Sequence, residues 1–183
     1  MSLAGLLGTA LLTVWFAAAA EPLAVVTVRA TFVYNLVRFT TWPAAKPSES
    51  SDLQLCILGA DAVADRLTAM APAQQANARA VVTRRLDKVS PDIAKTCHVL
   101  YVGYPDRADV RRAIDGVKGS PVLTVGESDA FLEDGGVASL VLERESMRIA
   151  VNPYAVRRAG LVLSSRLLSL ARIINGQEAD PGK

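Results

Sequence analysis

The sequence predicts an α/β fold: a single αβα-layered domain with a mostly parallel sheet and a C-terminal antiparallel hairpin. Short runs rich in Val, Leu and Ile alternate with amphipathic segments, and most connections are too long for hairpins, which favours parallel strands covered on both faces. Only the runs 137–142 and 147–151 are joined by a short polar turn, which predicts a hairpin. With 51% hydrophobic and 21% charged residues, the 183-residue chain can bury a core.

The first predicted element of this domain is a helix over residues 22–42. Apolar residues recur at spacings of three and four, which is typical of a helix with one buried face; they are Val25, Val28, Phe32, Leu36 and Phe39. The stripe is widened by Val26, Ala30, Val33 and Val37. A narrower polar face is expected opposite them, formed by Thr27, Thr31, Tyr34 and Arg38. The helix should end at Trp42-Pro43, because a residue before proline is disfavoured in the α region.

The remaining elements follow from alternating patterns and from capping residues. Strands are expected at 53–58, about 79–84, 97–102 and 121–125, followed by the hairpin. Helices are expected over 61–70, 92–96, 106–117, 128–132 and 153–159. The caps of two of these are Asp106 and Ser128, and Ser164 or Ser165 caps a last helix whose apolar face runs from Leu167 to Ile174. The polar stretch 44–52 is a predicted loop.

The first twenty residues are uncharged and nearly all apolar, and they end in four alanines. This pattern predicts a secretory signal peptide over 1–20, cleaved after Ala20, and therefore an exported protein. An uncleaved membrane anchor and a buried N-terminal helix are the alternatives. The folded domain is then expected over 21–176, with a flexible tail over 177–183.

The chain has two cysteines, Cys56 and Cys97, and each lies at or in an apolar strand-like run. An exported protein meets an oxidising compartment, so the two are predicted to form a disulfide between neighbouring strands. Two free buried thiols are the alternative. A catalytic thiol is disfavoured, since the sequence indicates no residue that could act as the general base for a cysteine.

Composition and motifs give little support to an enzyme. The chain has one histidine and no phosphate-binding loop, dinucleotide-binding motif or nucleophile elbow. His98 lies in an apolar run and is interpreted as a packed or hydrogen-bonded side chain. A net charge of +2 gives no reason to expect a nucleic-acid partner, and too few cysteines and histidines are present for most self-contained zinc sites.

Five residues are candidates for partner or ligand binding. Trp42 either anchors a ligand or partner at the helix end or plugs the core. Tyr34 and Arg38 belong to the expected polar face of the first helix. Arg148 and Asn152 lie on and just after the last hairpin strand. No cofactor is implied, and Gly126–Asp129 is interpreted as a helix start rather than an anion site.

The stretch from Arg29 to Pro43, RATFVYNLVRFTTWP, resembles the opening signature of YfiR-like periplasmic proteins, approximately K-A-x-F-L-Y-N-F-x-K-F-x-x-W-P. Four later blocks agree in the same order: 55–59, 97–101, 123–127 with 131–136, and 159–161 with 164–171. The ordered set covers nearly the whole predicted domain. It is more specific than any single block.

The resemblance implies a regulatory, non-enzymatic protein that inhibits a membrane-bound diguanylate cyclase through its periplasmic sensor domain. Inhibition lowers cyclic di-GMP and with it biofilm and exopolysaccharide output. An outer-membrane lipoprotein that sequesters the repressor and a homodimer are further implied partners. Cys56 and Cys97 match the widespread cysteine pair of the family, whereas a second pair found in some members is absent here.

Two other functions remain open. A small-molecule-binding module could serve a different membrane sensor or receptor, and the resemblance associates such binding with some members. A small exported thiol oxidoreductase is the second alternative, although the C-x-x-C spacing is absent and the two cysteines stand 41 positions apart.

Overall fold

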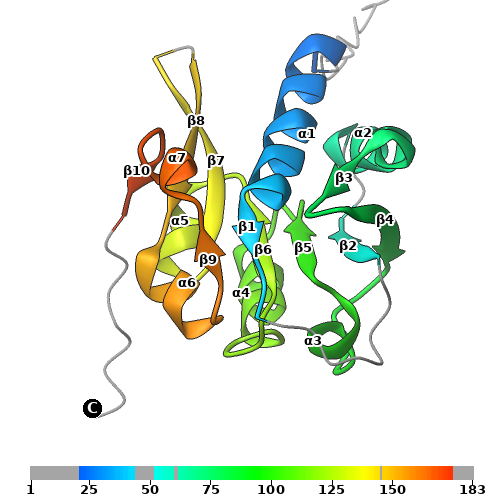
Figure 1. Ribbon diagram of the computed structural model, residues 1–183, viewed down its shortest axis with the longest axis vertical. Coiled ribbons are helices and arrows are strands. Elements are labelled where there is room, and N and C mark those ends of the chain that lie inside the picture. The colour runs from blue at the N-terminus through cyan, green and yellow to red at the C-terminus, as the bar shows by residue number, and fades with distance from the viewer. Residues whose placement is uncertain (1–20, 44–51, 60–61, 145, 175–183) are drawn as a thin grey trace, which may run out of the picture.

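Among the residues that the structure describes, an eight-stranded sheet forms the centre of the fold (Figure 1). The computed structural model describes residues 21–43, 52–59, 62–144 and 146–174. Across the sheet the strands follow the order β10-β8-β7-β6-β5-β2-β4-β3. Their bounds are β2 Leu53–Leu58, β3 Gln75–Ala76, β4 Arg79–Leu86, β5 Val99–Val102, β6 Leu123–Gly126, β7 Ala138–Glu143, β8 Ser146–Val151 and β10 Arg172–Ile173.

The five central strands, from β4 to β7, run parallel, and β7 pairs with β8 as an antiparallel hairpin. The predicted fold class is therefore confirmed. The predicted signal peptide and the predicted tail lie outside the described residues. The bounds of the helices are α1 Leu23–Arg38, α2 Ala62–Met70, α3 Ile93–Thr96, α4 Arg107–Asp115, α5 Asp129–Glu133, α6 Pro153–Arg158 and α7 Ser165–Leu168, with a short 3-10 turn, η1, at Ala71–Ala73.

Two hydrophobic cores cover the two faces of the sheet. On β2, Leu55 and Ile57 belong to the first core, whereas Cys56 and Leu58 belong to the second, as alternation along a strand requires. Helices α1 and α2 pack on the first face, and α3, α4 and α5 pack on the second; Figure 1 shows α1 and α4 on opposite sides of the sheet. Strands β2, β5 and β6 are thereby largely buried on both sides, whereas β4 stays partly exposed.

The first helix is shorter than predicted. It ends at Arg38, and Thr40–Thr41 form strand β1, which pairs antiparallel with β9, Val162–Leu163. The Thr40 hydroxyl donates to the Leu36 carbonyl over 2.7 Å and satisfies one of the last helical acceptors. The periodicity of one segment cannot predict this pairing, because the partner strand lies more than a hundred residues away.

The buried face of α1 also differs from the prediction. Tyr34, expected on the polar face, is 3% exposed, and its hydroxyl donates to the Leu67 carbonyl of α2 over 2.5 Å. Burial raises the pKa of Tyr34, so its hydroxyl stays protonated as a donor. Val25 and Val28, expected inside, are 37% and 44% exposed. The core side is formed by the predicted Leu36 together with Val26, Ala30, Val33 and Val37, the residues expected to widen the apolar stripe.

The predicted long C-terminal helix is wrong. Helix α7 has four residues, with Ser164 as its N-cap, and the chain then turns into β10, which pairs parallel with β8. The backbone N–H of Ile174 donates to the Val151 carbonyl over 2.9 Å, so this segment covers the otherwise open edge of β8. The backbone hydrogen bonds to the β8 edge determine the structure of this segment, although its leucines are spaced as in a helix.

Asp134 links α4 to the end of α5 and makes stability pH-dependent. Its carboxylate accepts from the Arg107 Nε over 2.8 Å and from the Arg111 Nε over 2.9 Å, while its side chain is 8% exposed. The hydrogen bond from Arg107, followed by that from Arg111, outweighs burial and lowers the pKa of Asp134. A depressed carboxyl pKa stabilises the fold above its ordinary value, and this contribution disappears as the pH falls through the folded-state pKa.

We therefore expect Asp134→Asn to be less stable than wild type at pH 7, with the difference shrinking as the pH falls below about 4. Denaturant unfolding across this range measures it. Asp115→Asn, at an exposed position at the end of α4, is the control and should follow wild type throughout. A difference between Asp134→Asn and wild type that stays constant from pH 7 to pH 2 would contradict the assignment.

Candidate functional site

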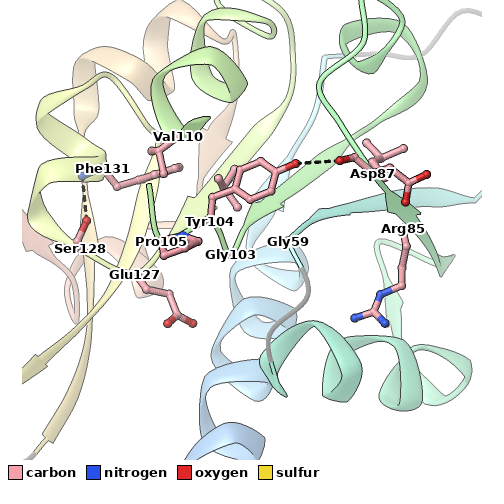
Figure 2. A pocket seen from close by; sticks show the side chains of 12 residues that line it. Gly59, Arg85, Asp87, Gly103, Tyr104, Pro105, Val110, Glu127, Ser128 and Phe131 are labelled. Atoms are coloured by element: carbon pink, nitrogen blue, oxygen red, sulfur yellow. Dashed lines mark hydrogen bonds between the residues drawn. The ribbon is translucent and has the colours of Figure 1, made fainter. Parts of the chain in front are cut away.

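A cleft of about 910 Å³ opens at the carboxyl ends of four parallel strands (Figure 2). Strand β4 lies on one side of β2 and β5 on the other, so the strand order reverses between β2 and β5. In parallel α/β sheets, ligands bind outside the carboxyl ends of the strands at such a reversal. The lining residues are Gly59, Arg85, Leu86, Asp87, Val102, Gly103, Tyr104, Pro105, Val110, Glu127, Ser128 and Phe131.

Two glycines bring the backbones that line this cleft together. Gly59 follows β2 with a φ of +102°, and Gly103 follows β5. A Cβ atom on Gly59 would lie 2.6 Å from the Gly103 carbonyl oxygen, closer than real contacts allow. Only glycine satisfies both the positive φ and the close approach. The loops after the two strands therefore pass each other at van der Waals distance.

Glu127 forms one wall and is held from two directions. Its Oε1 accepts from the Tyr101 hydroxyl over 2.9 Å, and its Oε2 lies 3.4 Å from the Arg29 guanidinium of α1. Arg29 also pairs with Glu21 over 2.9 Å. The carboxylate in the cleft is thus oriented by both the sheet and the first helix.

The opposite wall carries Arg85, which pairs with Asp65 of α2 over 2.8 Å. Tyr104 stands between the walls, as Figure 2 shows, and its hydroxyl donates to the Asp87 carbonyl over 3.4 Å. Partial burial, and after it the neighbouring carboxylates, raise the pKa of Tyr104. The cleft therefore offers the Glu127 carboxylate on one side, Arg85 with the Asp87 carboxylate on the other, and an aromatic ring between them, which suits binding of a small polar molecule.

Sequence reasoning recognised one part of this cleft and missed the rest. The predicted helix start at Gly126–Asp129 is confirmed: the Ser128 Oγ accepts from the backbone N–H of Phe131 and caps α5. Within that stretch, Glu127 was interpreted as part of the helix start and of a solvated helix face, although it directly follows a parallel strand. The rule that ligands gather at carboxyl ends of strands is the signal that would have identified it.

Cys56 and Cys97 are joined by a disulfide, with their Cα atoms 5.7 Å apart. Cys56 is fully buried within β2 and Cys97 is 5% exposed just before β5, and both belong to the second core. The bridge ties two neighbouring parallel strands together. Its surroundings are those of a structural link.

Trp42 is half-buried against the first core. Its Nε1 donates to the His98 carbonyl over 3.1 Å, and its ring meets the imidazole edge-on with centroids 6.4 Å apart. The backbone N–H of Gln54 donates to the His98 Nδ1, and the Arg79 guanidinium lies 3.2 Å from the Nε2. These residues lie at the amino ends of β2 and β5, opposite the cleft. The hydrogen-bonded role predicted for His98 agrees with this arrangement.

The other candidates lie apart from one another. Asn152 is 4% exposed; its Oδ1 accepts from the backbone N–H groups of Tyr154 and Ala155, and its Nδ2 donates to the Leu132 carbonyl. It therefore caps α6. Arg38 is exposed at the end of α1 and Arg148 is exposed on β8. The structure does not gather the five predicted residues into one site.

A family model described as YfiR/HmsC-like matches residues 26–172, which is most of the chain. The chain belongs to the YfiR/HmsC-like family. The match contains α1 from Val26 onward, the disulfide, the cleft and the whole sheet except for the last residue of β10. The resemblance that the sequence blocks indicated is thereby confirmed. The proteins of this family are periplasmic regulators rather than catalysts.

Solved structures share the fold of this YfiR/HmsC-like chain at low identity. A conserved domain protein from Vibrio cholerae matches with a TM-score of 0.55 and 13% identity over 81% of the chain. An ABC domain in complex with L-Trp from Streptococcus pneumoniae matches with a TM-score of 0.55 and 14% identity over 79% of the chain. The chain spans 59% and 60% of these two structures, respectively.

Two further observations concern the described residues of this family member. None of the helices there has the length and apolar character needed to cross a membrane. The same residues contain no group of three or more His, Cys, Asp and Glu side chains placed to hold a metal ion.

Proposed function

We propose that this YfiR/HmsC-like chain is a periplasmic protein that inhibits a membrane-bound diguanylate cyclase by binding the cyclase's periplasmic sensor domain. Lower cyclic di-GMP, and reduced biofilm and exopolysaccharide output, follow from that inhibition. The observation that carries the proposal is the family match over residues 26–172. An outer-membrane lipoprotein that sequesters the chain, and a homodimer, belong to the same proposal.

Inhibition of this kind requires a binding surface rather than a reaction centre. A protein shifts a two-state sensor only by binding its inactive state more tightly than its active state. The buried disulfide and the glycine-packed strand ends support a rigid domain that can present such a surface. Arg38 on α1 and Arg148 on the hairpin have exposed side chains, and we propose one of them as a contact to the sensor.

Binding of the purified domain to the purified sensor domain tests the proposal directly. We expect saturable binding, and we expect either Arg38→Glu or Arg148→Glu to weaken it about tenfold, because reversal of an interfacial charge replaces attraction with repulsion. Lys118→Glu, at an exposed turn after α4, is the control and should bind as wild type does. Wild-type binding that neither arginine variant weakens would exclude both contacts, and absence of wild-type binding would exclude this partner.

The cleft favours a second candidate function, a small-molecule-binding module that serves a membrane sensor or receptor. Its place at the strand-order reversal and its two charged walls support that role. A ligand from a metabolite panel should raise the melting temperature of the wild-type domain, and Glu127→Gln should reduce that shift. No shift with any compound, together with tight binding to the sensor domain, would remove this candidate.

A further inference from the structure

Strand β4 has an outer edge that is only partly covered. On its inner side it pairs with β2 from Val81 to Leu86. On its outer side β3 pairs with Arg79 and Ala80 alone, and one further bond runs from the Val81 N–H to the Gln74 carbonyl. Figure 1 shows β4 at one side of the sheet beyond β2. From Val82 onward, no strand in the described part of the chain pairs with this edge.

The backbone direction of this edge follows from the last bond to Gln74. The Val81 N–H points outward, and in a strand every second residue directs its N–H and C=O to the same side. Thr83 and Arg85 therefore direct both groups away from β2. Within the described residues these backbone groups have no hydrogen-bond partner. Two adjacent pairing positions are thus open at the edge of the sheet.

The side chains along this edge are basic and partly apolar. Arg84 and Arg85 are exposed and point to opposite faces, and Lys88 follows shortly after the strand. Arg85 forms a salt bridge with Asp65. Val82 is 40% exposed and offers an apolar contact beside the arginines.

We propose that the β4 edge, residues 82–86, is a docking site for an extended acidic segment of a partner protein, which adds to the sheet as a further strand. Backbone pairing at Thr83 and Arg85 supplies the alignment, as in other cases of strand addition. Consecutive carboxylates opposite Arg84 and Arg85, followed by an uncharged pair opposite Thr83 and Val82, are the pattern that this edge selects.

A second copy of the chain is a poorer occupant. Pairing of two β4 edges would bring the adjacent arginines of one copy close to those of the other, and like charges on paired strands are unfavourable. Basic residues on an edge strand commonly prevent such self-association. The positive charges of Arg84 and Arg85 repel a second copy and attract an acidic strand, so they favour an acidic partner over self-association. The proposal does not depend on the cyclase as a partner.

A short peptide tests the proposal with the full domain. The probe is fluorescein-labelled Thr-Val-Thr-Glu-Glu-Thr-Val-Thr, whose symmetric pattern fits a parallel or an antiparallel strand, and fluorescence anisotropy measures its binding. We expect saturable binding below 1 mM that a Lys-Lys counterpart of the probe lacks. A probe N-methylated at both Glu nitrogens should bind at least tenfold more weakly, because it lacks the N–H groups that would pair beside Arg84 and Arg85 and carries methyl groups in their place.

Variants of the chain locate the site. Thr83→Pro removes an outward N–H at an edge position where proline is tolerated, and Thr83→Val keeps that N–H as the matched control. We expect Thr83→Pro and Arg84→Glu each to weaken binding at least tenfold, and Thr83→Val and Lys118→Glu to change it less than twofold. Melting curves establish whether each variant folds. If Thr83→Pro does not fold, the N-methylated probe tests the backbone pairing independently.

Several results would overturn the proposal. They are no binding of the acidic probe at 1 mM, equal binding of the Lys-Lys probe, and equal binding of the N-methylated probe, which would indicate charge attraction without strand pairing. A dimer in sedimentation experiments that Arg84→Glu strengthens and the acidic probe does not dissociate would assign the edge to a second copy instead.

Discussion

Replacement of Cys56 by serine is expected to lower the free energy of unfolding by about 3–4 kcal/mol. The bridge to Cys97 closes a loop with a sequence separation of 41, and its loss restores that conformational freedom to the unfolded chain in the chain-entropy account. The serine hydroxyl would also be buried in the second core. Chemical denaturation under non-reducing conditions measures the change, and in cells we expect lower protein levels and weaker inhibition.

The controls for this prediction use the same bond. Cys97→Ser and the double variant should be destabilised about as much as Cys56→Ser, because each breaks the same link. Addition of a reductant should destabilise wild type and leave the double variant unchanged. If Cys56→Ser melted at the wild-type temperature without reductant, the bridge would not stabilise the fold.

Replacement of Gly59 by alanine should cost roughly 2–4 kcal/mol of stability and alter the cleft. The positive φ of +102° disfavours any residue with a Cβ atom, and that atom would lie 2.6 Å from a backbone oxygen that no rotamer change can move. The loops after β2 and β5 must separate to admit it. Denaturant unfolding measures the cost.

Gly119→Ala separates the cost of the positive φ from the cost of the steric contact. Gly119 also has a positive φ, +76°, but a Cβ atom there would meet nothing within 4 Å. Its replacement should therefore cost only the backbone strain, about 1 kcal/mol. Equal losses for the two variants would show that the contact between Gly59 and Gly103 has no energetic consequence.

Local signals in the sequence predicted the elements whose causes are local. Asp106 and Ser128 accept hydrogen bonds from the first turns of α4 and α5, and such caps are visible as residue types at set positions. The buried parallel strands and the β7–β8 hairpin follow from apolar runs and from the lengths of their connections. These features depend on neighbours within a few residues.

Features that depend on distant partners were not accessible to the same reasoning. The face of Tyr34 is decided by α2, whose Leu67 carbonyl accepts its hydroxyl. The short strands β1 and β10 exist because β9 and β8 offer backbone partners, not because of a pattern in their own residues. The Tyr34 side chain can lie on a polar or a buried face, and the leucine-rich segment after Ser164 can form a helix or a strand. Tertiary packing determines which structure forms in each case.

The candidate site shows the same division. The cysteine pair was predictable because both residues lie at or in apolar strand-like runs and the compartment favours oxidation. The cleft combines Arg85, Tyr104 and Glu127 from the ends of three strands, and only the strand order brings them together. Sequence reasoning directed attention to Trp42 instead, which packs at the opposite end of those strands.

Intracellular cyclic di-GMP in a strain that lacks this gene is the most direct measure of the proposed inhibition. We expect its concentration to rise on deletion and to return to the wild-type value when the gene is supplied on a plasmid. A plasmid carrying the Cys56→Ser variant should restore it only in part. An unchanged concentration in the deletion strain under several growth conditions would contradict inhibition of a diguanylate cyclase.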